Sequence, residues 1–363
     1  MVGMATKPGT DSGPSGPIDL GAQVHLIDTA MSGYSGITAA YAILADRPAL
    51  VETGTATSAP VVIEALAGLG IGPDDLATIV VTHIHLDHAG GVGDLAAAFP
   101  MARIVVQDSG ARHLADPSRL MSSARRVFGP AMDTLFGELL ATPVERIDAI
   151  GASGRIDLGA GRHLEAHHTP GHARHHLGLV DSATGDLYVG DAAGIYIPPV
   201  AADPLTGLGP AEAGAPSGTL LPGTPPPDFD LDLALRSLGR FEDLAATRLL
   251  FSHYGPIVDV VETLDRAKEE LRLWVDLVRT SIAQQRDGNG DAASAEFDLD
   301  HAVAMVRERT RERYAALLAE PEVAAKFEAL SSTAANVNGI ARWLETNRLE
   351  TNRSEQSQTQ GGQ

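Results

Sequence analysis

Cysteine is absent from the 363-residue sequence, and basic residues are scarce. Without cysteine the chain has no disulfides, no thiolate nucleophile and no zinc held by sulfur. The 27 Lys and Arg residues stand against 47 Asp and Glu, which gives a net charge of −20. Because binding to a nucleic-acid backbone normally needs a basic face, this charge argues against a nucleic-acid partner.

Long apolar runs are missing as well. No segment approaches the roughly 18 apolar residues that span a membrane, and residues 1–17 hold no apolar core of signal-peptide length. We therefore expect a cytoplasmic protein without a membrane partner. Aromatic residues make up only 4% of the chain, yet 44% of its residues are hydrophobic, which is enough for a sizeable globular core.

The chain exceeds one average domain and could hold two domains, or one large domain with extensions. Its composition predicts a disordered leader over residues 1–17, a main domain over 18–258, a helical C-terminal region over 259–345 and a disordered polar tail over 346–363. Residues 195–230 are a Pro/Gly-rich connection, and loops this long inside a domain are usually functional or disordered. We favour a substrate lid over a plain linker, because the loop starts four residues after Asp191. The C-terminal helices could cover a sheet, cap the substrate site or form a homodimer contact.

Strand and helix patterns alternate in the first part of the chain. Short apolar runs at 24–28, 39–44 and 48–52 predict a β-meander. A helical stripe over 61–70 is followed by a strand at 78–81, a helix at 92–99 and a strand at 103–106. This alternation is typical of an α/β architecture.

Four metal-ligand residues follow the strand predicted at 78–81: His83, His85, Asp87 and His88. If the chain stays extended, His83 and His85 point to the same side, because side chains alternate along a strand. The backbone must then turn for Asp87 and His88 to face a common centre, and this arrangement suits a second metal ion beside the first. The alternative is a chance cluster on a polar loop, but a core or surface histidine is usually solitary.

Three later residues stand at or just past the end of a predicted strand: His172, Asp191 and His253. Loops at one edge of a sheet can converge on a shared site. The seven residues, with the Thr169-Pro170-Gly171-His172 and Gly190-Asp191 sequences, resemble the ligand pattern of the metallo-β-lactamase-fold hydrolase superfamily. The resemblance runs from about residue 24 to 256, so that the main domain would be the catalytic domain.

The resemblance implies an αββα sandwich, with two sheets between layers of helices, followed here by a helical C-terminal extension. It assigns His83, His85 and His172 to one metal ion and Asp87, His88 and His253 to another, with Asp191 bridging the two. Nitrogen and oxygen ligands fit Zn²⁺, and Fe or Mn would also be tolerated. In such a centre a hydroxide bridging the two metal ions attacks a small-molecule substrate, because metal binding lowers the pKa of water from about 15.7 to near 7.

Among the hydrolases of this family, the residues favour cleavage of an ester-like bond, with a lactone as the first choice. The family's quorum-quenching lactonases usually carry a tyrosine three residues after the bridging aspartate, whereas this chain has Gly194 there and Tyr196 two residues further on. Tyr196 or Tyr254 could donate a hydrogen bond to the oxyanion, and Asp87 is also placed to steer a proton. The alternatives are a glyoxalase-II-like thioesterase, a mononuclear-iron sulfur dioxygenase, and a non-catalytic binding protein on the same scaffold.

Two further residues are candidates for supporting roles. His176 stands four residues after His172, where a supporting hydrogen bond is favoured over metal ligation. Glu52 occupies a position where relatives usually have aspartate. Its longer side chain leaves a supporting role open.

Overall fold

The computed structural model describes residues 16–198, 218–288 and 297–360. It divides the chain into two compact units. The first unit comprises Met1–Glu165, Asp181–Thr184 and Ser252–Gly255, and the second comprises Ala166–Val180, Gly185–Phe251 and Pro256–Gln363. The predicted leader over 1–17 lies almost entirely outside the described residues. The domain limits drawn from the sequence stay predictions.

A sheet of seven strands forms the centre of the first unit. Its strands pair in chain order, first antiparallel from β1 to β4 and then parallel from β4 to β7. The meander and the strand–helix alternation predicted from the sequence are both confirmed. The strands are β1 (Ile18–Asp19), β2 (Val24–Asp28), β3 (Ala39–Ile43), β4 (Ala49–Val51), β5 (Thr78–Val80), β6 (Arg103–Gln107) and β7 (Ile147–Ile150).

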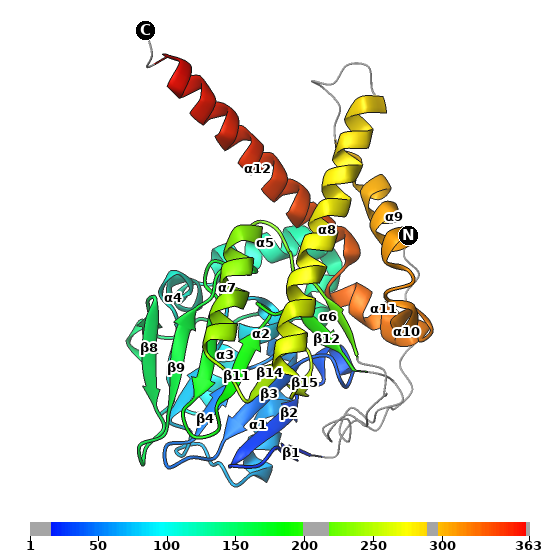
Figure 1. Ribbon diagram of the computed structural model, residues 1–363. Coiled ribbons are helices and arrows are strands. Elements are labelled where there is room, and N and C mark those ends of the chain that lie inside the picture. Colours follow the sequence, from blue (N-terminus) through cyan, green and yellow to red (C-terminus); the bar gives the residue numbers. More distant parts are fainter. Residues whose placement is uncertain (1–15, 199–217, 289–296, 361–363) are drawn as a thin grey trace. The chain divides into compact units, whose positions relative to one another are not determined.

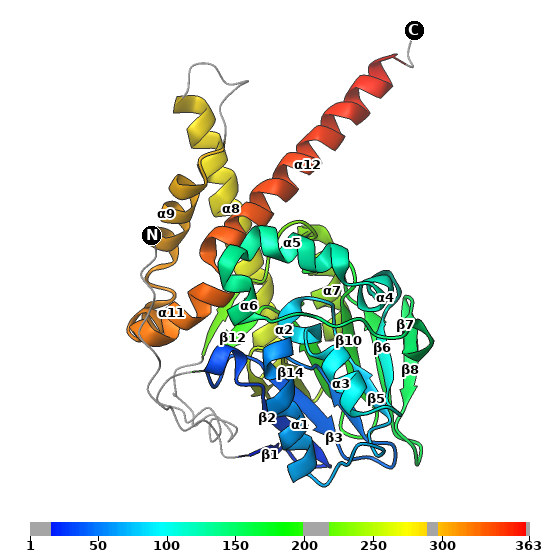
Figure 2. The ribbon, with the colours of Figure 1, turned by 180° about the vertical axis from the view of Figure 1, so that it is seen from behind.

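The helices of the first unit follow its parallel strands. Helices α1 (Ala59–Gly68) and α3 (Val92–Ala98) lie side by side over the sheet (Figure 2). Between them in sequence, α2 (Leu86–Ala89) is a single turn. The segment from 117 to 143 is helical in α5 (Ser118–Phe128) and α6 (Met132–Leu135) and irregular from 137 to 143. Helix α4 (Asp108–Ala115) precedes them.

A second sheet has the strand order β15-β14-β11-β10-β9-β8, and most of its residues belong to the second unit. Strand β11 pairs antiparallel with β10 and parallel with β14. Its strands are β8 (Ser153–Asp157), β9 (His163–His168), β10 (Leu177–Asp181), β11 (Asp186–Gly190), β14 (Arg248–Phe251) and β15 (Gly255–Ile257). The strands expected just before Asp191 and His253 are therefore confirmed as β11 and β14.

The Pro/Gly-rich connection is more ordered at its ends than the sequence predicts. Strands β12 (Ile195–Ile197) and β13 (Thr219–Leu221) pair antiparallel, with Ile195 opposite Leu221. Both isoleucines of β12 are buried, so the apolar residues here form a short ladder instead of an irregular loop. Residues 199–217, which hold most of the predicted lid, lie outside the described residues.

Helices make up the rest of the second unit, as predicted. The long helix α8 (Val260–Gly288) contacts α7 (Leu231–Asp243), α9 (Leu299–Thr310) and α12 (Thr333–Gln360), and Figure 1 shows α12 diverging from α8 toward the C-terminus. Two short helices, α10 (Ala315–Leu318) and α11 (Pro321–Leu330), connect α9 to α12. No helix within the described part of the chain has both the length and the apolar character needed to cross a membrane.

The C-terminal tail differs from the prediction. Helix α12 continues to Gln360, whereas the composition predicts a disordered segment from 346. The segment is polar, but between Gly339 and Gly361 it contains neither glycine nor proline, so nothing in its backbone interrupts the helix once it has begun.

A buried polar network joins α8 to the segment after α9. The hydroxyl of Tyr314 donates to Glu270 Oε2 at 2.5 Å and accepts from Trp274 Nε1 at 2.7 Å, while Arg313 donates to the other oxygen of Glu270. Glu270 is only 2% exposed. Burial, and then the adjacent Glu270, raise the pKa of the Tyr314 hydroxyl above its ordinary value.

This raised pKa predicts a loss of stability in alkali. The folded protein holds the Tyr314 proton more tightly than the unfolded chain, so the stabilisation is present below the unfolded pKa of about 10 and is lost as the pH rises above it. We expect Tyr314→Phe to be less stable than the unchanged protein at pH 8. The difference in the free energy of unfolding between the two proteins should narrow above pH 10 by up to about 1.4 kcal/mol per pH unit. Urea unfolding from pH 8 to 11 measures this difference, and a difference that does not change with pH would contradict the prediction.

Candidate metal centre

The loop after β5 brings its ligand residues together by changing backbone conformation. His83 lies in the irregular segment that follows the strand, and His85 caps the N-terminus of α2 with extended backbone angles. The single turn of α2 then carries Asp87 and His88, as the predicted turn requires. A side chain at Gly90 would lie 2.2 Å from the Leu86 carbonyl oxygen, so this close-packed turn needs glycine.

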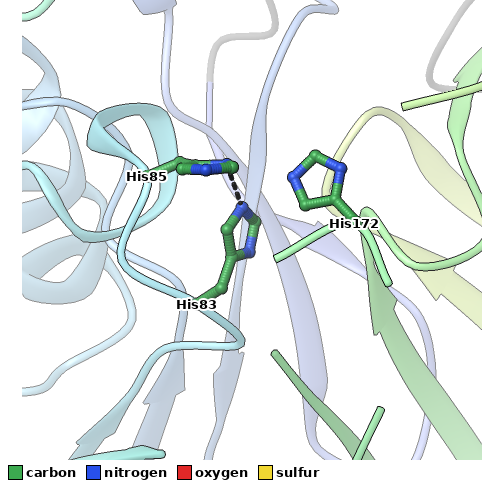
Figure 3. A group of neighbouring side chains, drawn as sticks. All are labelled: His83, His85 and His172. Atoms are coloured by element: carbon green, nitrogen blue, oxygen red, sulfur yellow. Dashed lines mark hydrogen bonds between the residues drawn. The ribbon is translucent and has the colours of Figure 1, made fainter. Parts of the chain in front are cut away.

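His83 and His85 face each other across the loop. His83 Nε2 lies 2.9 Å from His85 Nδ1 (Figure 3). On the other side of the His83 ring, Nδ1 lies 3.0 Å from Thr82 Oγ1, whose own proton is donated to Glu52. Thr82 must therefore accept from His83 Nδ1–H, which leaves the lone pair of His83 on Nε2, the nitrogen that points toward His85.

Three side chains of the first unit form a compact group of possible metal ligands: Asp87, His88 and His253. Each offers one ligand atom, and these atoms all lie within 4.8 Å of one another. His253 Nδ1 is 2.9 Å from the carbonyl oxygen of Ile37, which can only accept a hydrogen bond. The lone pair of His253 is thus on Nε2, which lies 3.3 Å from Asp87 Oδ2.

The carboxylate of Glu52 contacts His88 of this group and the hydroxyls of two neighbouring residues. It accepts from Thr82 Oγ1 at 2.5 Å and from Ser252 Oγ at 3.0 Å, and it lies 3.3 Å from His88 Nδ1. The side chain is 1% exposed, and the backbone of Glu52 has a left-handed φ of +67° directly after β4. A supporting role, which the sequence left open, is therefore what the contacts show. The carboxylate fixes the tautomers of His83, through Thr82, and of His88.

The second unit carries His172 and Asp191. His172 Nε2 lies 3.5 Å from Asp191 Oδ2, and His172 Nδ1 donates to the carbonyl oxygen of Gly223 at 3.0 Å. Both side chains are at most 6% exposed. His172 thus presents its Nε2 lone pair on the side of Asp191, which is the orientation expected of a metal-binding histidine.

His176 supports Asp191 instead of acting as a ligand. Its Nε2 accepts from the backbone N–H of Asp191 at 3.1 Å, so its Nδ1 carries the proton and donates to Thr169 Oγ1 at 2.9 Å. Both ring nitrogens are therefore occupied, one by the backbone of Asp191 and one by the Thr169 hydroxyl, which confirms the supporting hydrogen bond predicted for this histidine.

The donor set fits a divalent metal ion. Asp87, His88 and His253 supply one oxygen and two nitrogens, and the hydrogen bonds to the other ring nitrogens orient both imidazoles as in known metal sites. Nitrogen and oxygen donors without sulfur are compatible with Zn²⁺, Fe or Mn. Within the first unit, the ligating atoms of Asp87, His88 and His253 lie close together, and within the second unit those of His172 and Asp191 do.

The two tyrosines predicted to assist catalysis have different surroundings. Tyr196 lies on β12, and its hydroxyl accepts from the backbone N–H of Gly218 at 3.2 Å. Burial raises the pKa of Tyr196, which keeps its phenol protonated at neutral pH. Tyr254 is 1% exposed, and its hydroxyl lies 3.4 Å from Asp28 Oδ2.

Comparison with known families gives a match to the central part of the chain. The family described as "Metallo-beta-lactamase superfamily" matches residues 33–253, more than half of the sequence. The metallo-beta-lactamase fold-containing protein ST1585 of Sulfurisphaera tokodaii is 29% identical over 212 residues, which cover 56% of this chain and 72% of that protein. Human metallo-beta-lactamase domain-containing protein 1 is 35% identical over 115 residues, 31% of this chain and 39% of its own length.

Solved structures show the same fold. The crystal structure of the archaeal protein ST1585 superposes with a TM-score of 0.57 at 20% identity and covers 88% of this chain and 98% of its own. The metallo-beta-lactamase family protein TTHA1429 from Thermus thermophilus gives a TM-score of 0.59 at 19% identity, covering 91% of this chain and 95% of its own. These matches confirm the predicted fold class, with the helical C-terminal region present in addition.

Proposed function

Because the chain belongs to the metallo-β-lactamase superfamily, we propose that it is a dinuclear metal-dependent hydrolase of ester-like bonds, with a lactone as the first candidate substrate. The proposal includes the ligand set that the family resemblance implies. His83, His85 and His172 would bind one metal ion, Asp87, His88 and His253 the other, and Asp191 would bridge them. Zn²⁺ is the metal we expect.

One observation carries this proposal: the group formed by Asp87, His88 and His253. Their ligand atoms lie within 4.8 Å of one another, and each imidazole has its other nitrogen tied to a fixed acceptor. Histidines that only fill a core do not need this orientation. Fixed tautomers are what metal binding requires, and members of this superfamily are mostly hydrolases, so the group favours an enzyme.

When bound, a pair of divalent metal ions supplies Lewis acidity and lowers the pKa of a coordinated water from about 15.7 to near 7. The chain's own residues then have three tasks. The histidines hold their Nε2 lone pairs in place. Asp87, which is 20% exposed, can accept a proton while serving as a ligand. Glu52 accepts from the backbone N–H of Thr82 and His176 from that of Asp191, and these bonds hold the backbone that carries the ligands.

A substrate panel tests the proposal. Full-length protein reconstituted with Zn²⁺, and separately with Fe²⁺, should be assayed on lactones, esters, thioesters and phosphodiesters, with His83→Ala as the blank. We expect two bound zinc equivalents and hydrolysis of a lactone. Preference for a thioester would favour the glyoxalase-II-like alternative. One bound iron in place of two zinc equivalents would favour the sulfur dioxygenase over a hydrolase. No metal-dependent activity on any substrate would leave the non-catalytic alternative.

Tyr196 is the better of the two tyrosines for stabilising an oxyanion. Its oxygen already accepts from Gly218, so its proton stays available for donation, whereas the Tyr254 hydroxyl is directed to Asp28. We expect Tyr196→Phe to lower kcat by about tenfold or more with metal content unchanged, since loss of one oxyanion donor costs about 10²–10³ in favourable cases. Tyr254→Phe is the matched control and should change kcat less than Tyr196→Phe. The reverse order would contradict the assignment.

A further inference from the structure

A short segment after β13 lies between a metal-ligand candidate and the C-terminal helix, all within the second unit. On one side, the carbonyl oxygen of Gly223 accepts from His172 Nδ1 at 3.0 Å. A side chain at Gly223 would meet the same nitrogen at 2.9 Å, so the segment packs directly against the imidazole. Any displacement of this segment would therefore move the His172 ring or break its hydrogen bond.

On its other side, the segment is bound by Asn336 of α12. The backbone N–H of Thr224 donates to Asn336 Oδ1 at 2.6 Å. The Thr224 hydroxyl lies 3.1 Å from the backbone oxygen of Asn336 and 3.2 Å from Oδ1. Thr224 is fully buried and Asn336 is 3% exposed, so these bonds do not compete with bulk water.

The amide of Asn336 has only one orientation that satisfies its neighbours. Its Nδ2 donates to Ser331 Oγ at 3.1 Å, and its Oδ1 faces the N–H of Thr224. Turning the amide would place two donors against each other, which is costly in a buried site. One turn further along α12, Gly339 allows the close approach, because a Cβ there would lie 1.9 Å from the Thr224 carbonyl oxygen.

We infer that Asn336 is a positioning residue that holds the His172 imidazole in its metal-binding orientation through Thr224 and Gly223. The inference rests on the proposed function, in which His172 binds a metal ion. Asn336 has no direct contact with the metal site. Through its bond to Thr224, it fixes the position of the neighbouring Gly223 carbonyl oxygen. That oxygen accepts from His172 Nδ1–H and so sets the tautomer and the orientation of the imidazole ring. The C-terminal helix is thereby coupled to the ligand chemistry of the enzyme.

The test compares Asn336→Ala with a matched control on the same helix. Asn338, two residues away, is exposed, so Asn338→Ala removes a similar side chain without touching the segment. Asn336→Asp keeps an acceptor for the Thr224 N–H and serves as the conservative rescue. Zn²⁺ affinities of the full-length proteins are measured by chelator competition, and the Nδ1–H signal of His172 is followed by NMR in the metal-free state.

We expect Asn336→Ala to weaken binding of one of the two Zn²⁺ equivalents by about tenfold, the lower end of the range for residues behind a metal ligand, and to shift or broaden the His172 Nδ1–H signal. Asn338→Ala should match the unchanged protein, and Asn336→Asp should restore most of the affinity. If Asn336→Ala does not fold, Thr224→Val weakens the same link and should give a smaller change in the same direction.

Three results would count against the inference. Unchanged Zn²⁺ affinity and an unchanged His172 signal in Asn336→Ala would overturn it while the proposed function stands. Equal weakening of both equivalents, without rescue by Asn336→Asp, would show a general structural role instead of positioning. Failure of the unchanged protein to bind either Zn²⁺ or Fe²⁺ would overturn the proposed function, and the inference with it.

Discussion

Replacement of Asp191 by alanine is expected to lower turnover by about a thousandfold or more, with loss of metal and without loss of the fold. A metal centre contributes several kcal/mol of charge stabilisation to hydrolysis, and about 4 kcal/mol corresponds to a thousandfold in rate. The fold should survive because His176 holds the backbone N–H of residue 191, not its carboxylate. Metal content, kcat and circular dichroism are the measurements.

Asp191→Asn separates charge from shape in the same experiment. The amide occupies nearly the volume of the carboxylate but cannot bridge two cations with a negative charge. We expect its turnover to lie close to that of Asp191→Ala. Full activity in either variant would show that residue 191 is not the bridging ligand, and would favour a mononuclear site.

Substitutions at Glu52 should lower the stability of the protein strongly. Glu52→Ala would leave the buried hydroxyls of Thr82 and Ser252, and Nδ1 of His88, without the carboxylate they now contact. Leaving buried polar groups unsatisfied costs about 1–3 kcal/mol each, so we expect a loss of about 3–5 kcal/mol in the free energy of unfolding. Urea denaturation of the metal-free protein measures it.

Glu52→Asp is the informative partner of that variant. Aspartate keeps the charge but is shorter by one methylene, so it cannot reach Thr82, Ser252 and His88 from the same backbone position. We expect an intermediate stability and about a tenfold weaker metal affinity, because residues behind metal ligands typically affect affinity by 10–100-fold. Equal stability of Glu52→Asp and the unchanged protein would mean that the backbone adapts and that the longer side chain is not required.

The local pattern of the sequence was enough to predict the strands and helices that surround the ligands. The short apolar run before His83 predicted the strand β5, and the ligand residues after it predicted the turn, because both depend on neighbours in sequence. The same holds for the helical C-terminal region, whose apolar residues recur at three and four. Local composition was also a poor guide in one place. The polar residues after 345 predicted a disordered tail, whereas α12 continues to Gln360.

The supporting contacts could not be predicted in this way. Glu52 meets Ser252 across 200 positions, and His172 meets Gly223 across 51, so neither pair leaves a periodic signal. The pairing of β12 with β13 was missed for the same reason, because the two strands are separated by a long Pro/Gly-rich stretch. The position of Glu52, an acidic residue directly after an apolar strand, did mark it as a candidate. Its hydrogen-bond partners could not be predicted from the sequence.

The bond between Thr224 and Asn336 spans 112 positions, and this separation bears on how the protein is made. A ribosome releases the chain from its N-terminus onward, so His172 and Asp191 emerge well before α12 has been synthesised. In the nascent chain the segment that carries Gly223 still lacks its partner. We therefore expect the stable metal-binding orientation of His172 to await completion of the last helix.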